Sequence, residues 1–162
     1  MKKFFALMLV LTLSVSLLCA CGDHANNDTL EIEDYEWQML YGKREKDSNY
    51  PTIYGVDDAP VNKYSATYVP MTLVARDGTL QIKSTQTDEI LASGTYTEIN
   101  DERIFNYELT IDGMVFYVCL CMSAELPTTV GDRSFNATAH GKYALRFYSE
   151  DCSYQIIFAA GK

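Results

Sequence analysis

The sequence predicts an all-β fold, a single antiparallel meander of about eight strands that closes into a barrel. Hydrophobic side chains recur with a period of two along much of the chain, which is the spacing of a strand with one buried face. Asp-Gly turns separate several of these segments. No segment has a convincing amphipathic-helix pattern. A β-sandwich is the alternative, because the number of strands alone does not distinguish the two folds.

The N-terminus predicts a signal peptide. Met1-Lys2-Lys3 is positively charged, and the 15 residues from Phe4 to Leu18 carry no charge. This apolar stretch is shorter than the about 20 residues that a membrane-spanning helix needs. Its length and flanking residues instead fit a secretory signal.

Leu18-Cys19-Ala20-Cys21 follows the apolar stretch and resembles the lipobox of bacterial lipoproteins. A small residue precedes Cys21, and a leucine lies three positions before it. The resemblance implies that a diacylglycerol modifies Cys21 after cleavage and anchors the protein at the extracytoplasmic face of the cell membrane. Residues 1–20 would be the signal, 21–29 the lipidated tether and 30–162 the β-barrel domain. An ordinary cleaved signal with incidental cysteines is the alternative.

The charge excludes one class of partner. The 162 residues contain 22 acidic and 13 basic side chains, a net charge of −9. Without the two lysines of the signal, 11 basic and 22 acidic side chains remain, and the net charge is −11. Such a chain is not expected to bind nucleic acid, which requires a basic face. Anionic lipid would also repel it, so the lipid anchor is expected to provide the membrane attachment.

The first half of the domain contains four expected strands: one within Leu30–Tyr41 around Trp37, then Thr52–Tyr54, Met71–Arg76 and Thr79–Ser84. The last two are expected to form a hairpin through Asp77-Gly78. Both positions of such a turn have positive φ, which Asp and Gly tolerate better than other residues.

The second half contains five expected strands: Ile90–Ile99, Arg103–Ile111, Met114–Ser123, Tyr143–Ser149 and Ser153–Ala159. Within Arg103–Ile111, Phe105, Tyr107, Leu109 and Ile111 share one face, and only Ile104 is out of place on the polar face. The expected turns are Asn100–Glu102, Asp112-Gly113 and Glu150–Cys152.

The overall strand pattern resembles a lipocalin-like or streptavidin-like small barrel. Trp37 in the first strand and Gly94-Thr95-Tyr96 in mid-chain also resemble features of lipoproteins from Gram-positive gut bacteria. The resemblance covers about Leu30 to Ala159. A barrel of about eight strands either holds one small ligand or is filled with side chains. We therefore expect a non-catalytic module that binds a partner or a small hydrophobic or aromatic ligand at the barrel mouth. A structural or interaction protein with a filled barrel is the alternative.

Two long segments have no clear strand pattern. Gly42–Lys63 and Ala124–Lys142 are longer than most unstructured loops, and loops of this length tend to be functional or disordered. Ser134–Thr138 could form a short strand within the second. Both segments are expected at an end of the barrel, where they could form a lid.

Cys119, Cys121 and Cys152 are expected to remain unpaired. Two cysteines at i and i+2 on one strand have Cα atoms about 6.5–7 Å apart, at the limit for a disulfide. Cys152 is expected in a turn near Asp112-Gly113, far from both. Two thiolates could bind Cu(I) or zinc, but the apolar run around them favours packing residues and no metal site.

Other polar residues give no catalytic pattern, so neither an enzyme nor a cofactor is expected. Asp132, Ser134 and His140 are close in sequence but lack a Gly-x-Ser-x-Gly turn. Carboxylates cluster at Glu31, Glu33, Asp34 and Glu36 and again at Asp57-Asp58, without the spacing of a calcium loop. His24 lies in the tether and is expected to be solvated.

Overall fold

The computed structural model describes residues 30–44, 52–56, 67–99, 104–130 and 133–161. The predicted signal peptide, Cys21 and its tether with His24, Asp57-Asp58 and Asp132 lie outside these residues. Apart from short 3-10 helices, the regular structure of the described residues is all β, as predicted.

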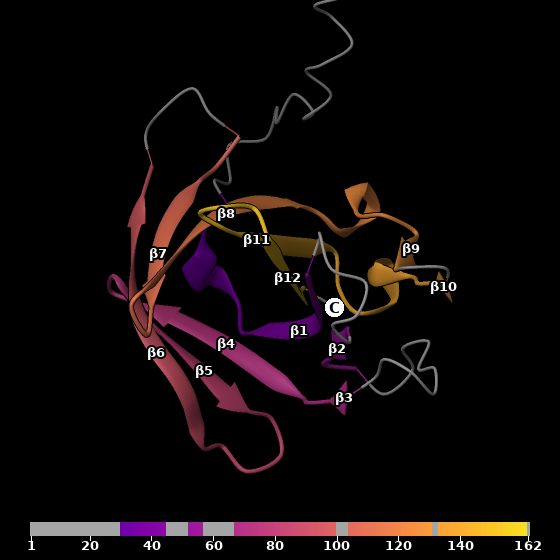
Figure 1. The fold of residues 1–162 in the computed structure, drawn as a ribbon, viewed down its shortest axis with the longest axis horizontal. Helices are drawn as coiled ribbons and strands as arrows, with labels where there is room; N and C mark the ends of the chain where they lie inside the picture. The colour runs from indigo at the N-terminus through magenta and orange to yellow at the C-terminus, as the bar shows by residue number, and fades with distance from the viewer. Residues whose placement is uncertain (1–29, 45–51, 57–66, 100–103, 131–132, 162) are drawn as a thin grey trace, which may run out of the picture.

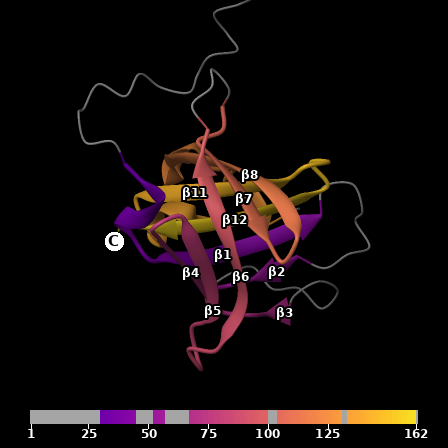
Figure 2. The ribbon, with the colours of Figure 1, turned by 90° about the vertical axis from the view of Figure 1, so that its left-hand side faces the viewer.

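Eight antiparallel strands of the described residues close into a meander barrel, compatible with a lipocalin-like fold (Figures 1 and 2). Each strand pairs with the next one around the wall, and β12 pairs with β1 to close it. In chain order the wall consists of β1 (Trp37–Arg44), β4 (Met71–Arg76), β5 (Thr79–Ser84), β6 (Ile90–Glu98), β7 (Tyr107–Ile111), β8 (Met114–Met122), β11 (Tyr143–Ser149) and β12 (Tyr154–Ala160).

The remaining elements are short and lie outside the wall or at its ends. Two of them, β2 and β3, continue the sheet beyond β1, and β9 pairs only with β10. These elements are η1 (Ile32–Asp34), β2 (Ile53–Tyr54), β3 (Thr67–Tyr68), η2 (Ser123–Glu125), β9 (Thr129–Val130), β10 (Arg133–Ser134) and η3 (Ala137–Ala139).

Both predicted Asp-Gly turns are confirmed. Asp77 and Gly78 have φ of 50° and 75°, and Asp112 and Gly113 have φ of 47° and 80°. These left-handed values are those of the tight hairpin turn that matches the twist of the flanking strands. The turns join β4 to β5 and β7 to β8.

Two local predictions were wrong, and β3 was not predicted. The strand predicted from Arg103 begins only at Tyr107, and Ile104 is 68% exposed before it. The strand predicted over Ser134–Thr138 is instead the end of β10 followed by η3. β3 had no sequence signal, because a two-residue strand has no period to detect.

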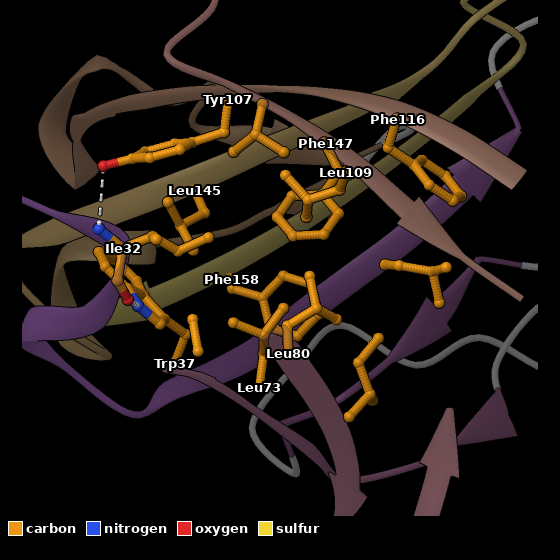
Figure 3. Packing of buried hydrophobic residues seen from close by; sticks show 14 of the residues in the cluster. Ile32, Trp37, Leu73, Leu80, Tyr107, Leu109, Phe116, Leu145, Phe147 and Phe158 are labelled. Carbon is orange, nitrogen blue, oxygen red and sulfur yellow. Dashed lines mark hydrogen bonds between the residues drawn. The ribbon is translucent and has the colours of Figure 1, made fainter. Parts of the chain in front are cut away.

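The main hydrophobic core fills much of the barrel interior. Alternate residues of β7 and β8 point inward, which buries Leu109 and Val118 completely. Figure 3 shows Leu80, Phe147 and Phe158 converging with Leu109 from strands around the wall. The period-two pattern therefore predicted the inward face of Tyr107, Leu109 and Ile111 in β7 correctly. Phe105, which was predicted on the same face, packs against a separate cluster of buried residues instead.

One end of the barrel is closed by η1, and we call it the closed end. Trp37 is fully buried there, and its Nε1 donates a hydrogen bond to the Ile32 carbonyl oxygen at 2.7 Å. The Ile32 amide in turn donates to the Tyr107 hydroxyl oxygen at 3.3 Å (Figure 3). The Tyr96 hydroxyl donates to the Glu33 carboxylate and accepts from the Gly78 amide. Side chains from three strands thus hold η1 across the barrel opening.

Among the described residues, no helix has the length and apolar character needed to cross a membrane.

Candidate ligand-binding site

The barrel wall separates where β1 leaves β4. The two strands share only the pairs Trp37↔Leu73 and Gln38↔Thr72. Farther along, β1 pairs with β2 on that side instead, through Tyr41 and Gly42. The end of the barrel beyond this point, at Arg44 and the start of β12, is called the open end.

A cavity of about 300 Å³ lies at the open end. Its walls come from β1, β2, β4, β5 and β12, so it occupies the space between the separated strands. The lining is mainly aliphatic, with one phenyl ring, and its polar groups lie in residues at the strand ends. The lining residues are Met39, Gly42, Lys43, Arg44, Ile53, Met71, Ile82, Tyr154, Gln155, Ile156 and Phe158.

A bulge in β1 shapes this cavity. The pairing with β12 shifts between Met39 and Tyr41, which leaves Leu40 as an inserted residue. After the shift, Gly42 lies opposite Ile156 on the cavity side. A Cβ on Gly42 would lie 3.2 Å from the Met39 methyl carbon and 3.8 Å from Ile156 Cγ1. The missing side chain of Gly42 therefore keeps this part of the cavity open.

The rim of the cavity combines positive charge with an aromatic ring. The Arg44 guanidinium lies over the Tyr154 ring, with its central carbon 5.2 Å from the ring centroid. Tyr154 is 45% exposed, and Ile53 beside the cavity is 36% exposed. A ligand whose apolar part fills the cavity would therefore meet charged and aromatic groups at its outer tip.

The two long segments play different roles. Gly42, Lys43, Arg44 and Ile53 of the first segment line the cavity, as expected for a segment at the mouth. The second segment, Ala124–Lys142, was expected at an end of the barrel where it could form a lid, but none of its described residues lines this cavity. Leu126, Phe135 and Ala137 pack instead with Cys119 and Cys121 in a second hydrophobic cluster outside the wall. This cover explains why β8 is apolar on both faces.

The three described cysteines have free thiols. Cys119 and Cys121 are buried on the outer face of β8, and Cys152 is exposed in the β11–β12 turn. Pairing of Ser149 with Phe116 places that turn at the same end as Asp112-Gly113, as predicted. The hydrogen bond from Cys121 lowers the pKa of the Cys119 thiol to about 7, and the positive charge of Arg146 adds to the effect. The same bond and burial raise the pKa of Cys121.

The other polar candidates have structural roles in the described residues. Glu31 and Asp34 form a reciprocal capping arrangement on η1, and Glu33 accepts from Tyr96. His140 is buried and stacks on Phe135, with ring centroids 5.8 Å apart. Ser134 is exposed on β10. No group of three His, Cys, Asp or Glu side chains suited to a metal occurs in the described part of the chain.

Sequence reasoning located the mouth but missed the individual residues of the cavity. Met39, Met71 and Ile82 resemble ordinary core residues, and only their position beside the strand separation makes them line the cavity. The one available signal was Gly42, because a glycine within a strand often marks a bulge or a close approach.

No family model, curated protein or solved structure matches this chain. Its function is therefore inferred from the cavity and the residues around it.

Proposed function

We propose that this chain is a membrane-anchored extracytoplasmic lipoprotein whose barrel binds one small hydrophobic ligand without catalysis. The cavity of about 300 Å³ at the open end carries this proposal. Its volume is at the lower limit of known ligand sites, which span about 300–1,000 Å³. A compact aliphatic or aromatic molecule suits this volume and the apolar lining.

The composition of the lining supports binding rather than catalysis. Its polar members among the described residues are Lys43, Arg44, Tyr154 and Gln155. These groups include no carboxylate, and no Ser or Cys nucleophile beside a base, so the usual hydrolytic arrangements have no basis here. The flexible side chains of Met39 and Met71 allow the wall to adapt to different ligand shapes.

The position of the N-terminal elements relative to the cavity supports an anchored arrangement. η1 and the start of β1 lie at the closed end, whereas Arg44 and Tyr154 lie at the open end. A tether from Cys21 to Thr29 reaches at most about 30 Å from the closed end. An anchor at Cys21 would therefore attach the membrane to the closed end of the barrel and not to the open end.

Titration with a neutral fluorescent naphthylamine probe tests the ligand site. The full chain in detergent should bind one probe molecule with a rise in fluorescence, and Gly42→Leu should abolish the rise. Thr110→Leu, on the exposed face of β7, is the matched control and should bind as the unmodified chain does. Equal binding by both variants would place the probe elsewhere. Failure of a panel of apolar probes to bind would support the alternative, a structural or interaction protein.

Metabolic labelling with a radioactive fatty acid in a bacterial host tests the anchor separately. The unmodified chain should incorporate label and fractionate with the membrane. Cys21→Ser should lose both properties, whereas Cys19→Ser should retain them. Label that persists in Cys21→Ser and disappears in Cys19→Ser would move the anchor to Cys19.

A further inference from the structure

The strongest feature outside the cavity is the thiol pair of Cys119 and Cys121. Both residues lie on the outer face of β8, and each is only 6% exposed. The two residues are at i and i+2 of one strand, so their side chains lie on the same side of β8 and pack in the same buried cluster. Cross-strand pairing places Arg146 of β11 directly opposite Cys119.

The surroundings of the pair are apolar. Leu126, Phe135 and Ala137 from the covering segment and Ala144 from β11 belong to the same buried cluster. Such an environment disfavours two adjacent thiolate charges unless a cation binds between them.

Arg146 supplies a second, independent observation. Its Nε is buried and has no hydrogen-bond acceptor among the described residues. The guanidinium lies over the Tyr148 ring, with its central carbon 5.5 Å from the centroid. A buried guanidinium nitrogen without an acceptor is costly and needs an explanation. A negatively charged group beside Cys119 would provide the missing electrostatic partner.

We propose that Cys119 and Cys121 bind one Cu(I) ion as a two-coordinate bis-thiolate, with Arg146 balancing its charge. Two S–H bonds break, two Cu–S bonds form and two protons pass to solvent, and no electron is transferred. The resulting complex carries one negative charge, which the guanidinium neutralises. The spacing alone favoured a packing role for these cysteines, and the geometry of Arg146 changes that interpretation.

The number of protein ligands favours Cu(I) over zinc at this site. Structural zinc requires four ligands, whereas the described residues supply only these two, without a group of three. Cu(I) is a soft monovalent ion that binds thiolates strongly and accepts two of them. The site is buried and contains one cation, Arg146, that can balance charge. It therefore suits a Cu(I) bis-thiolate of charge −1 better than it suits a divalent ion.

Anaerobic Cu(I) titration against a chromophoric chelator tests the proposal on the full, reduced chain in detergent. One Cu(I) per chain should bind, with a thiolate-to-copper absorption band in the ultraviolet. Cys119→Ser and Cys121→Ser should each lose this binding, whereas Cys152→Ser should retain it. Arg146→Gln should weaken it about 10–100-fold, as the loss of groups that support a metal site does.

X-ray absorption of the unmodified chain loaded with Cu(I) gives a readout that requires no variant. Two sulfur neighbours support the proposal, and three or more ligands around copper would overturn it. Unchanged uptake by a folded Cys119→Ser/Cys121→Ser variant would also overturn it, as would loss of binding in Cys152→Ser. The site lies outside the barrel wall, so failure of probe binding in the cavity leaves this test unaffected.

Discussion

Met39 and Tyr41 lie two residues apart on β1, yet their side chains pack on opposite sides of the barrel wall. Met39 belongs to the interior core and Tyr41 to the outer cluster. In a regular strand, residues i and i+2 share a face. The inserted Leu40 breaks this rule, because a bulge shifts the side-chain alternation by one residue. The shift turns Gly42 toward Ile156 and the cavity.

Filling the cavity should abolish ligand binding without destabilising the protein. Gly42→Leu adds apolar atoms to an empty space and removes a flexible glycine from a strand. We expect the free energy of unfolding to rise by about 1 kcal/mol, after the cost of moving Met39. Probe binding should be lost at the same time. Chemical denaturation and probe titration on one preparation measure both, and a destabilised variant that still binds would contradict the assigned site.

The stability of the closed end should depend on the buried hydroxyl group of Tyr107. Tyr107→Phe keeps the ring but removes the acceptor of the Ile32 amide, which then has no hydrogen bond in a buried position. We expect a loss of about 1 kcal/mol in the free energy of unfolding. Tyr68→Phe, at an exposed position, should change it by less than about 0.5 kcal/mol. Equal effects of the two substitutions in urea denaturation would argue against a stabilising role for this bond.

Gly94 should tolerate no side chain. A Cβ at this position would overlap the carbonyl oxygen of Thr110 on the neighbouring strand. Gly94→Ala must therefore push β6 away from β7, and we expect a loss of at least about 2 kcal/mol. Ser93→Ala, at the exposed adjacent position, is the control and should be nearly neutral. A thermal melt of Gly94→Ala that matches the control would show that the two strands can separate without cost.

Asp151 should make stability depend on pH in the acidic range. Its carboxylate accepts hydrogen bonds from Ser149 Oγ at 2.8 Å, and from Ser153 N at 3.0 Å and Oγ at 2.7 Å. The Ser153 hydroxyl is the largest cause that lowers its pKa to about 2. Asp151 in the unfolded chain titrates at about 3.9, so its contribution to stability is present above that pH and is lost as the pH falls toward about 2.

Thermal melts between pH about 5 and 2 test this linkage. Asp151→Asn should show a shallower fall in melting temperature than the unmodified chain, and Ser153→Ala an intermediate one. NMR titration of the Asp151 carboxyl group measures its pKa directly. A titration midpoint of about 3.9 in the folded protein would contradict the prediction.

Local sequence patterns are enough to predict the strands of the barrel wall and its Asp-Gly turns. Asp77-Gly78 and Asp112-Gly113 have the residues that left-handed φ requires, and Leu109 and Ile111 lie two apart on the buried face of β7. Such features depend on backbone sterics and on alternation over a few residues. The Cys119 and Cys121 spacing likewise fixed their shared face.

The position of the cavity and the surroundings of the two thiols depend on contacts between distant segments of the chain. The cavity exists because β1 leaves β4 after two residue pairs, and Leu40 turns Gly42 inward. Arg146 lies opposite Cys119 through the pairing of two strands that are separated by 20 residues in the sequence. These contacts depend on register between distant segments, which no local pattern encodes because a shift of one residue reverses every face.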